Sequence, residues 1–172
     1  MKLFEVEKLS YYAPNKGYNV KLIEINGNIS FSILVGSNEA QSIALALEGI
    51  ETPRPMIHDI VIDLLFSSDI TLDKVEICNF VKGIYYARLY IKNINIGIKK
   101  IDCRPSDAIA IALRYCCPIH VKNHILKNIK STEIISDSSF SSTQEYKNEE
   151  SPENIIEKLN FALNEAINKE NY

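Results

Sequence analysis

The segment that decides the fold lies at residues 101–115 and reads IDCRPSDAIAIALRY. It begins as the end of an alternating strand and, after an Arg-Pro pair, changes to the small and apolar residues of a packed helix. Ser106 is a natural N-cap residue, and Asp107 places a negative charge at the positive end of the helix. The segment therefore predicts a strand that leads directly into a helix over residues 108–115.

Three stretches with period-two alternation precede and enter this segment. They lie at residues 72–81, 84–91 and 94–103. Such alternation is typical of strands with one buried face. Lys82-Gly83 and Lys92-Asn93 separate the stretches and are suited to tight turns. Together these signals predict a three-stranded β-meander followed by a helix.

The first part of the chain shows the same pattern. Its predicted strands lie at residues 3–9, 20–25 and 29–35. The last two flank Asn26-Gly27, and an Asn-Gly pair between apolar runs is the strongest short signal for a β-hairpin. A helix capped by Ser37 or Asn38 should follow and end before Gly49.

A second helix is predicted from Met56 to about Ser67, after a proline-rich linker. Its apolar stripe comprises Ile57, Ile60, Val61 and Leu64. The whole chain thus predicts an α+β fold, in which two units of a β-meander plus a helix form a mixed or antiparallel sheet packed with helices. Two interpretations of the repeated unit remain open: duplication, and convergence on small residues where a helix packs closely on a sheet.

Composition limits the chain to one domain and a tail. The chain has 172 residues, of which 46% are hydrophobic, and a formal charge of -3. Residues 1–126 carry 14 Lys and Arg against 13 acids, whereas residues 127–172 carry 5 against 9. We expect a domain at residues 1–130, a disordered Ser-rich linker at 131–151 and an amphipathic helix at 152–172.

The charge pattern also bears on partners and location. A near-neutral body without a basic run argues mildly against a dedicated nucleic-acid binder. The N-terminal residues carry four charges within the first eight positions, and no apolar run approaches the length of a membrane span. We therefore expect a cytoplasmic protein without a membrane segment. The four cysteines lie at no zinc spacing and are expected to be small buried hydrophobes.

No Gly-rich phosphate loop, Ser-His-Asp order, zinc signature or dinucleotide fingerprint is evident, so any enzymatic site must come from charged clusters. The first cluster is His58, Asp59 and Asp63 in the second helix. Asp59 and Asp63 share a helix face and could hold Mg²⁺. The alternative is that this cluster forms the solvated side of an amphipathic helix.

The second cluster comprises Asp102, Arg104, Ser106 and Asp107, where the strand passes into the helix. A helix N-terminus and an arginine can bind phosphate, and two carboxylates beside them could hold a metal that polarises a phosphodiester. The structural alternative is that Asp107 caps the helix and Arg104 pairs with Asp102.

A third feature is an alternating aromatic and basic face formed by Tyr86, Arg88 and Tyr90. Nucleic-acid bases could stack on such a face. Burial against another subunit is the alternative we favour, and the apolar residues Ile94, Ile96 and Ile98 nearby support it. We therefore expect the protein to form a homo-oligomer.

At these positions the chain resembles the bifunctional nuclease (BFN) domain family. The resemblance is carried by the run from Arg54 to Asp59, by residues 75–89, and above all by residues 101–114 with the Pro-Ile-His-Val that follows. It spans roughly residues 1–130 and includes the long Asp-x-Arg-Pro-Ser-Asp-Ala run. It implies an oligomer-forming α+β domain and, from the activity of some members, degradation of DNA and RNA.

The resemblance leads to a hypothetical site for metal-assisted phosphodiester hydrolysis. Asp59, Asp102 and Asp107 would hold Mg²⁺ or Mn²⁺, and His58 would be the general acid or base. The phosphate would be bound by Arg104, Ser106 and Arg88. The competing hypothesis is a non-enzymatic oligomeric binding or adaptor protein without a cofactor.

The C-terminal stretch at residues 156–172 is similar to the first half of a UVR motif, a helical hairpin that docks proteins. The motif's second helix would begin where these residues end, so we expect no complete hairpin from them. A single amphipathic helix of this length is marginal in water, so its apolar stripe requires the body, a second copy or a protein partner.

Deleting residues 131–172 should leave the melting temperature nearly unchanged, because the Ser-rich linker cannot bury enough apolar surface to order itself against the domain. Thermal denaturation of the full chain and of the truncated chain checks this expectation. A large drop in melting temperature would mean that the final helix packs into the domain core.

Overall fold

The structure is a computed structural model that describes residues 1–95 and 97–127. Its strands are β1 (Lys2–Tyr12), β2 (Gly17–Glu24), β3 (Ser30–Val35), β4 (Thr71–Val81), β5 (Ile84–Asn93), β6 (Gly97–Cys103) and β7 (Ile119–Val121). Its helices are α1 (Ser37–Leu47), α2 (Ile57–Ser67) and α3 (Pro105–Tyr115), with a 3₁₀ helix η1 (Ala13–Asn15) after β1 and a helical stretch at residues 123–127. This mixture of sheet and helices confirms the predicted α+β class.

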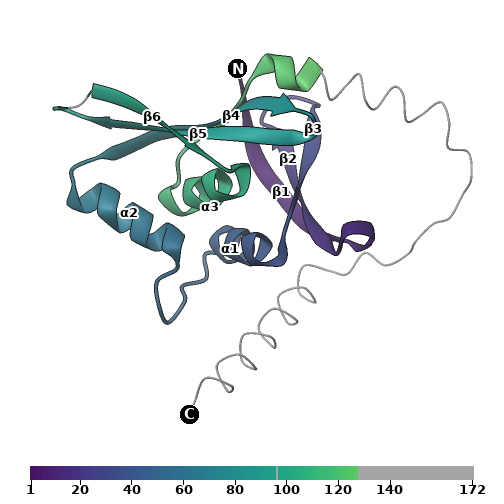
Figure 1. The fold of residues 1–172 in the computed structure, drawn as a ribbon, viewed down its shortest axis with the longest axis horizontal. Coiled ribbons are helices and arrows are strands. Elements are labelled where there is room, and N and C mark those ends of the chain that lie inside the picture. Colours follow the sequence, from purple (N-terminus) through teal and green to yellow (C-terminus); the bar gives the residue numbers. More distant parts are fainter. Residues whose placement is uncertain (96, 128–172) are drawn as a thin grey trace, which may run out of the picture.

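In this part of the chain the strands form one seven-stranded sheet with the order β3-β2-β1-β7-β4-β5-β6. Strands β1 to β3 and β4 to β6 are the two predicted meanders, and both are antiparallel. Strand β7 joins them, antiparallel to β1 and parallel to β4, so the sheet is mixed. Figure 1 shows α1 and α3 within the curve of this sheet. Both units therefore cover the same pair of helices.

One predicted turn is correct and the other is displaced. Lys82 and Gly83 have φ values of 49° and 82°, the left-handed conformation that a two-residue hairpin turn requires. The turn predicted at Lys92-Asn93 is wrong, because both residues still belong to β5 and Asn93 pairs with Gly97. The side chain of Asn93 donates to the carbonyl oxygens of Ser68 and Asp69 and so holds the end of the strand in place.

The helix starts differ by one to three residues from the prediction. Pro105 occupies the first turn of α3 and Arg104 is its N-cap, so Ser106 is not the cap but a buried residue of the first turn. Proline suits this position because its φ is already helical and it has no N–H to satisfy. Gly36, rather than Ser37 or Asn38, is the N-cap of α1. Gly49 follows α1 with a positive φ, as predicted.

Helix α3 lies at the centre of the hydrophobic core. Its residues from Ala108 to Ala112 are all buried, and it contacts α1, α2, β4 and β5. The alanines allow neighbouring elements to approach the helix closely, and Ile109 and Ile111 fill the space between these elements. The small residues that suggested close packing in the sequence therefore have that role here.

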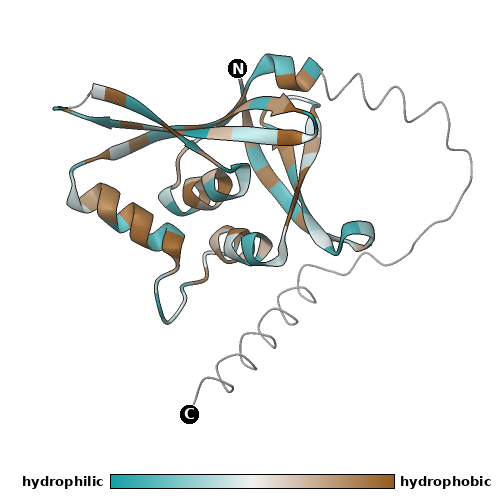
Figure 2. Ribbon diagram, in the orientation of Figure 1, coloured by the Kyte–Doolittle hydropathy of each residue, from teal (hydrophilic) through white to brown (hydrophobic). Residues whose placement is uncertain are grey.

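Helix α2 exposes most of its predicted apolar stripe. Ile57 and Leu64 are 65% and 60% exposed, and Ile60 is also exposed, whereas His58 and Leu65 are buried. Figure 2 shows the hydrophobic colouring along this helix. The helix is oriented in this way because His58 and the neighbouring Asp59 reach polar groups on α1 and α3.

The remaining predictions about the chain have mixed outcomes. Cys78 is buried and Cys103 and Cys117 are half-buried, but Cys116 is exposed, so the prediction that all four are buried is wrong.

Within residues 1–95 and 97–127 no helix has the length and apolar character needed to span a membrane. The predicted linker at 131–151 and helix at 152–172 lie outside the described residues.

Two matched substitutions test the packing of α2 and α3. Ile109→Ala should destabilise the protein by about 2–5 kcal/mol, because it leaves a cavity in the centre of the core. Ile57→Ala should change the stability by less than about 0.5 kcal/mol, because that side chain is exposed. Urea denaturation of both variants checks the contrast. Equal destabilisation by the two substitutions would show that α2 buries its outer face in solution.

Candidate functional site

Helices α1, α2 and α3 bring together a polar network made of Glu39, Ser42, His58, Arg104 and Asp107. The hydroxyl oxygen of Ser42 lies 2.9 Å from Nδ1 of His58. On the other side of the ring, Nε2 of His58 lies 3.4 Å from Oδ1 of Asp107. A buried imidazole is thus held through both nitrogens, by one residue from α1 and one from α3.

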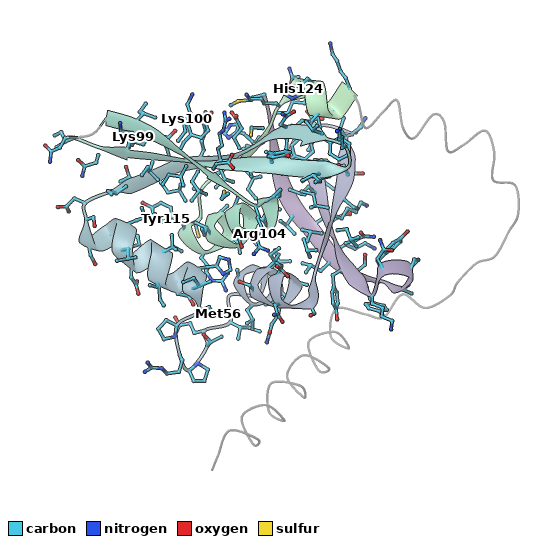
Figure 3. The ribbon with its side chains drawn as sticks, in the orientation of Figure 1. Met56, Lys99, Lys100, Arg104, Tyr115 and His124 are labelled. Carbon is cyan, nitrogen blue, oxygen red and sulfur yellow. The ribbon has the colours of Figure 1, made fainter. Side chains whose placement is uncertain are left out.

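Arg104 forms the exposed end of the polar network. Its Nε and Nη2 atoms donate to Oδ2 and Oδ1 of Asp107 at 2.9 and 3.1 Å. Its Nη1 atom donates to Oε1 of Glu39 in α1 at 2.9 Å. Its side chain is 66% exposed, and Figure 3 shows Arg104 between α3 and α1. The guanidinium therefore closes the gap between these helices at the protein surface.

A second arginine, Arg114, holds the three helices together from the inside. Its Nε atom donates to Oδ1 of Asp59 at 2.8 Å, and Nη1 donates to the carbonyl oxygens of Ser42 and Ala110. Oδ2 of Asp59 in turn accepts the backbone N–H of Met56 at the start of α2. This arrangement fixes the start of α2, and hence His58, against α1 and α3.

The ionisation of Asp107 follows from its position in the polar network. Burial disfavours its charged form, but the hydrogen bonds from Arg104 and His58 outweigh burial and lower the pKa of Asp107 below its ordinary value. Asp107 therefore remains a carboxylate at neutral pH, where it can accept from Arg104 and orient the His58 ring.

The contacts among Ser42, His58 and Asp107 resemble the hydroxyl, imidazole and carboxylate groups of a hydrolytic triad. In such a triad the nucleophile faces Nε2 and the carboxylate faces Nδ1. Here the two nitrogens are exchanged, and Ser42 is only 1% exposed. Ser42 is therefore a positioning residue for the imidazole and not a nucleophile.

The structure brings together some of the residues that the sequence singled out. His58, Arg104 and Asp107 lie in one network, and Asp59 lies beside it as the partner of Arg114. Ser106 is buried in the first turn of α3. The structural alternative is wrong in its pairing of Arg104 with Asp102, because Arg104 pairs with Asp107 and Glu39.

Asp102 and Arg88 lie away from this network. They are neighbours across β6 and β5, and Nε of Arg88 lies 3.9 Å from Oδ1 of Asp102. Their strand neighbours Leu89 and Ala87 are buried toward the helices, so Arg88 and Asp102 belong to the opposite face of the sheet.

The predicted metal ligands Asp59, Asp102 and Asp107 do not form a metal site in this geometry. The oxygens of Asp107 accept from Arg104 and His58, and those of Asp59 accept from Arg114 and a backbone N–H. In the described residues no group of three or more His, Cys, Asp or Glu side chains could hold a metal ion.

An open cavity of about 570 Å³ lies next to Arg114, between the loop that follows α1 and helices α2 and α3. Asp59, Asp63 and Cys116 line this cavity with Arg114. The predicted pairing of Asp59 and Asp63 on one face of the helix is therefore correct, although Asp59 is engaged by Arg114 and Asp63 is exposed.

Sequence reasoning missed three residues of this region: Glu39, Ser42 and Arg114. A signal existed for two of them. Ser42 is a polar residue on the apolar side of a helix, between Ala40 and Ile43, and Arg114 is one of only four arginines in the chain. Glu39 had no such signal, since an acidic residue in the first turn of a helix is usual.

Comparison with known proteins identifies relatives of the chain. A family model described as bifunctional nuclease domain matches residues 20–133. An uncharacterized protein of Mycobacterium tuberculosis is 41% identical over 106 residues, which cover 61% of this chain and 62% of the relative.

Two plant proteins are also similar. Bifunctional nuclease 1 of Oryza sativa subsp. japonica is 32% identical over 125 residues, which cover 72% of this chain and 38% of the relative. Bifunctional nuclease 2 of Arabidopsis thaliana is 28% identical over 122 residues, which cover 68% and 36% of the two chains. The chain therefore spans about three fifths of the mycobacterial relative and little more than a third of the plant proteins.

The pH dependence of stability should reveal the role of Asp107. Because its pKa is lowered in the folded protein, its ionised form stabilises the fold at a pH above its unfolded pKa of about 4. The stability difference between the wild type and Asp107→Asn should be present at pH 5 and shrink as the pH falls below about 4.

Urea denaturation between pH 3 and pH 5 measures this difference. Asp102→Asn, which changes an exposed carboxylate on the opposite face, is the matched control and should have little effect on stability. A wild-type advantage over Asp107→Asn that stays constant down to pH 3 would contradict the assignment.

Proposed function

The chain belongs to the bifunctional nuclease domain family, and from this premise we propose that it hydrolyses phosphodiester bonds of DNA or RNA at the polar network. The names of its plant relatives support the class of reaction. The observation that carries the choice of site is the His58 imidazole, held by Ser42 and Asp107 beside the exposed guanidinium of Arg104.

Arg104 is the proposed phosphate-binding residue. Its contacts with Asp107 and Glu39 lie at the surface, where an ion pair contributes at most about 1 kcal/mol. A phosphate group can therefore replace one carboxylate at the guanidinium without a large loss of stability. Arginine suits this role because its planar donors match two phosphate oxygens at once.

His58 is the proposed general acid or base. An imidazole can accept and donate a proton near neutral pH, and Ser42 fixes the orientation of this ring through Nδ1. Because Ser42 lies against Nδ1, the proposal assigns proton transfer to Nε2, whose 3.4 Å contact with Asp107 is the longer of the two.

A divalent ion, Mg²⁺ or Mn²⁺, remains part of the proposal as a cofactor for the assay to test. Such ions often bind through one or two carboxylates together with substrate phosphates. The three predicted carboxylates do not converge, so the proposed roles of Arg104 and His58 involve no bound metal.

A second candidate function is non-enzymatic binding. Two observations favour it: the carboxylates of the polar network are already paired, and α2 presents Ile57, Ile60 and Leu64 to solvent. In that case the network only fastens the helices together, and the apolar face of α2 docks another protein or a second copy. The predicted docking by residues 152–172 and the predicted homo-oligomer belong to this candidate.

A cleavage assay on Arg104→Ala and His58→Gln tests the proposed function. Each substitution should lower turnover of single-stranded DNA or RNA by a factor of about a hundred or more, the scale of losing one charge-stabilising or proton-transfer group. Lys21→Ala is the matched control, because Lys21 also forms a surface ion pair, with Glu7 at 2.7 Å, but lies on β2. Each variant is assayed with Mg²⁺, with Mn²⁺ and with a chelator.

Thermal stability is measured on the same preparations, because His58 is buried and its loss can unfold part of the protein. Variants that lose activity only in proportion to the folded fraction would refute the catalytic assignment. The polar network would then be structural, and non-enzymatic binding would be the better account.

A further inference from the structure

The face of the sheet away from α1 and α3 carries a row of charged and aromatic residues. Lys74 of β4, Tyr90 of β5 and Lys100 of β6 are direct neighbours across three strands. Direct cross-strand neighbours project to the same side of a sheet. Figure 3 shows Lys100 on the side of the sheet opposite the helices. Tyr90 therefore has a lysine on each side on an open surface.

The two lysines of this row share one aromatic ring. Nζ of Lys74 lies 4.8 Å from the centre of the Tyr90 ring, and Nζ of Lys100 lies 5.4 Å from it. No carboxylate of residues 1–95 or 97–127 lies within salt-bridge distance of either ammonium group. The π-electrons of Tyr90 attract both cations but leave their charge uncompensated.

The acidic residues on this face are neutralised by other partners. Glu76 is 2% exposed and contacts the hydroxyl of Tyr90 at 3.2 Å and the ammonium of Lys122 at 3.5 Å. Asp102 pairs with Arg88. Burial lowers the pKa of the neighbouring His120, and Lys74 adds to the shift, so this imidazole is neutral at pH 7. The surplus positive charge is therefore located at Lys74 and Lys100.

An exposed aromatic ring lies on the same face. Tyr86 is 40% exposed and lies four residues before Tyr90 on β5. At a rise of about 3.3 Å per residue, the two tyrosines are about 13 Å apart along the strand. A planar ligand group can stack on Tyr86 while an attached anion reaches the lysines.

We propose that this face binds single-stranded nucleic acid, with backbone phosphates at Lys74 and Lys100 and a base stacked on Tyr86. A positively charged groove beside aromatic rings is the general chemistry of single-strand binding. The site lies across the sheet from the polar network and needs no cleavage, so it goes beyond the proposed function. It holds a strand of DNA or RNA whether or not that strand is hydrolysed.

The same charges disfavour a second copy of the chain as the occupant. In a two-fold symmetric dimer the same surface patch is buried on both subunits, so an interface on this face would contain both copies of the uncompensated lysine pair. Bringing unpaired like charges together in a desolvated interface costs free energy, and lysine is depleted in interface cores. A polyanion instead compensates both ammonium groups.

Fluorescence anisotropy with labelled twelve-residue oligo-dT and oligo-U tests the proposal on the full chain. Lys74→Gln/Lys100→Gln should raise the dissociation constant by about tenfold or more and reduce the salt slope by about 0.7 for each lost phosphate contact. The matched control is Lys2→Gln/Lys21→Gln, which removes two lysines that are paired with carboxylates on β1 and β2. The control should bind within about twofold of the wild type.

A second variant separates stacking from charge. Tyr86→Leu should weaken oligonucleotide binding but leave the binding of inorganic tripolyphosphate unchanged, because only the base contact is lost. Thermal denaturation checks that each variant is folded.

The proposal is overturned if the wild type does not bind the oligonucleotides at low salt, or if the lysine variant and its control lose the same affinity. It is also overturned if sedimentation shows a wild-type dimer that Lys74→Gln/Lys100→Gln dissociates, because the face would then be a protein interface. Binding without cleavage would support this site even if the proposed hydrolysis failed.

Discussion

The largely buried guanidinium of Arg114, whose side chain is 11% exposed, makes the contacts on which the arrangement of the helices depends. It binds the carboxylate of Asp59 on α2 and the carbonyl oxygens of Ser42 on α1 and Ala110 on α3. A buried charge requires such partners, because removing one of them leaves the other without compensation. The positions of α1 and α2 against α3 follow from this requirement. So does the position of His58, which is adjacent to Asp59 and reaches Ser42 and Asp107 only in this arrangement.

The same constraint explains why α2 exposes apolar residues. A helix packed only by the hydrophobic effect would turn Ile57, Ile60 and Leu64 toward the core. Here the polar contacts of His58 and Asp59 turn that stripe outward. The domain therefore has a polar network between its helices and an apolar surface on the solvent-facing side of α2. A nuclease would use the first of these features, and a binding protein would use the second.

Charged residues that are close in sequence are divided between the two faces of the sheet. Asp102 points away from the helices, whereas Arg104 and Asp107 point toward α1 and α2. The last residues of β6 alternate between the two faces, and the chain then enters α3. The proposed cleavage and the proposed single-strand binding therefore use separate sides of the domain. A bound strand that engages both must pass around the edge of the sheet at β6.

The sequence by itself determined the α+β class, both meanders, the three helices and the segment at residues 101–115 that links strand to helix. These depend on local periodicity, on turn residues such as Lys82-Gly83 and on proline at the start of α3, all of which act over a few neighbouring residues. Only the tertiary structure decided that β7 joins the meanders into one sheet. It also decided that His58 meets Ser42 and Asp107 across 16 and 49 residues, and that Asp102 lies apart from the other carboxylates. Such contacts depend on how whole helices pack around a buried charge, and no local pattern in the chain records that packing.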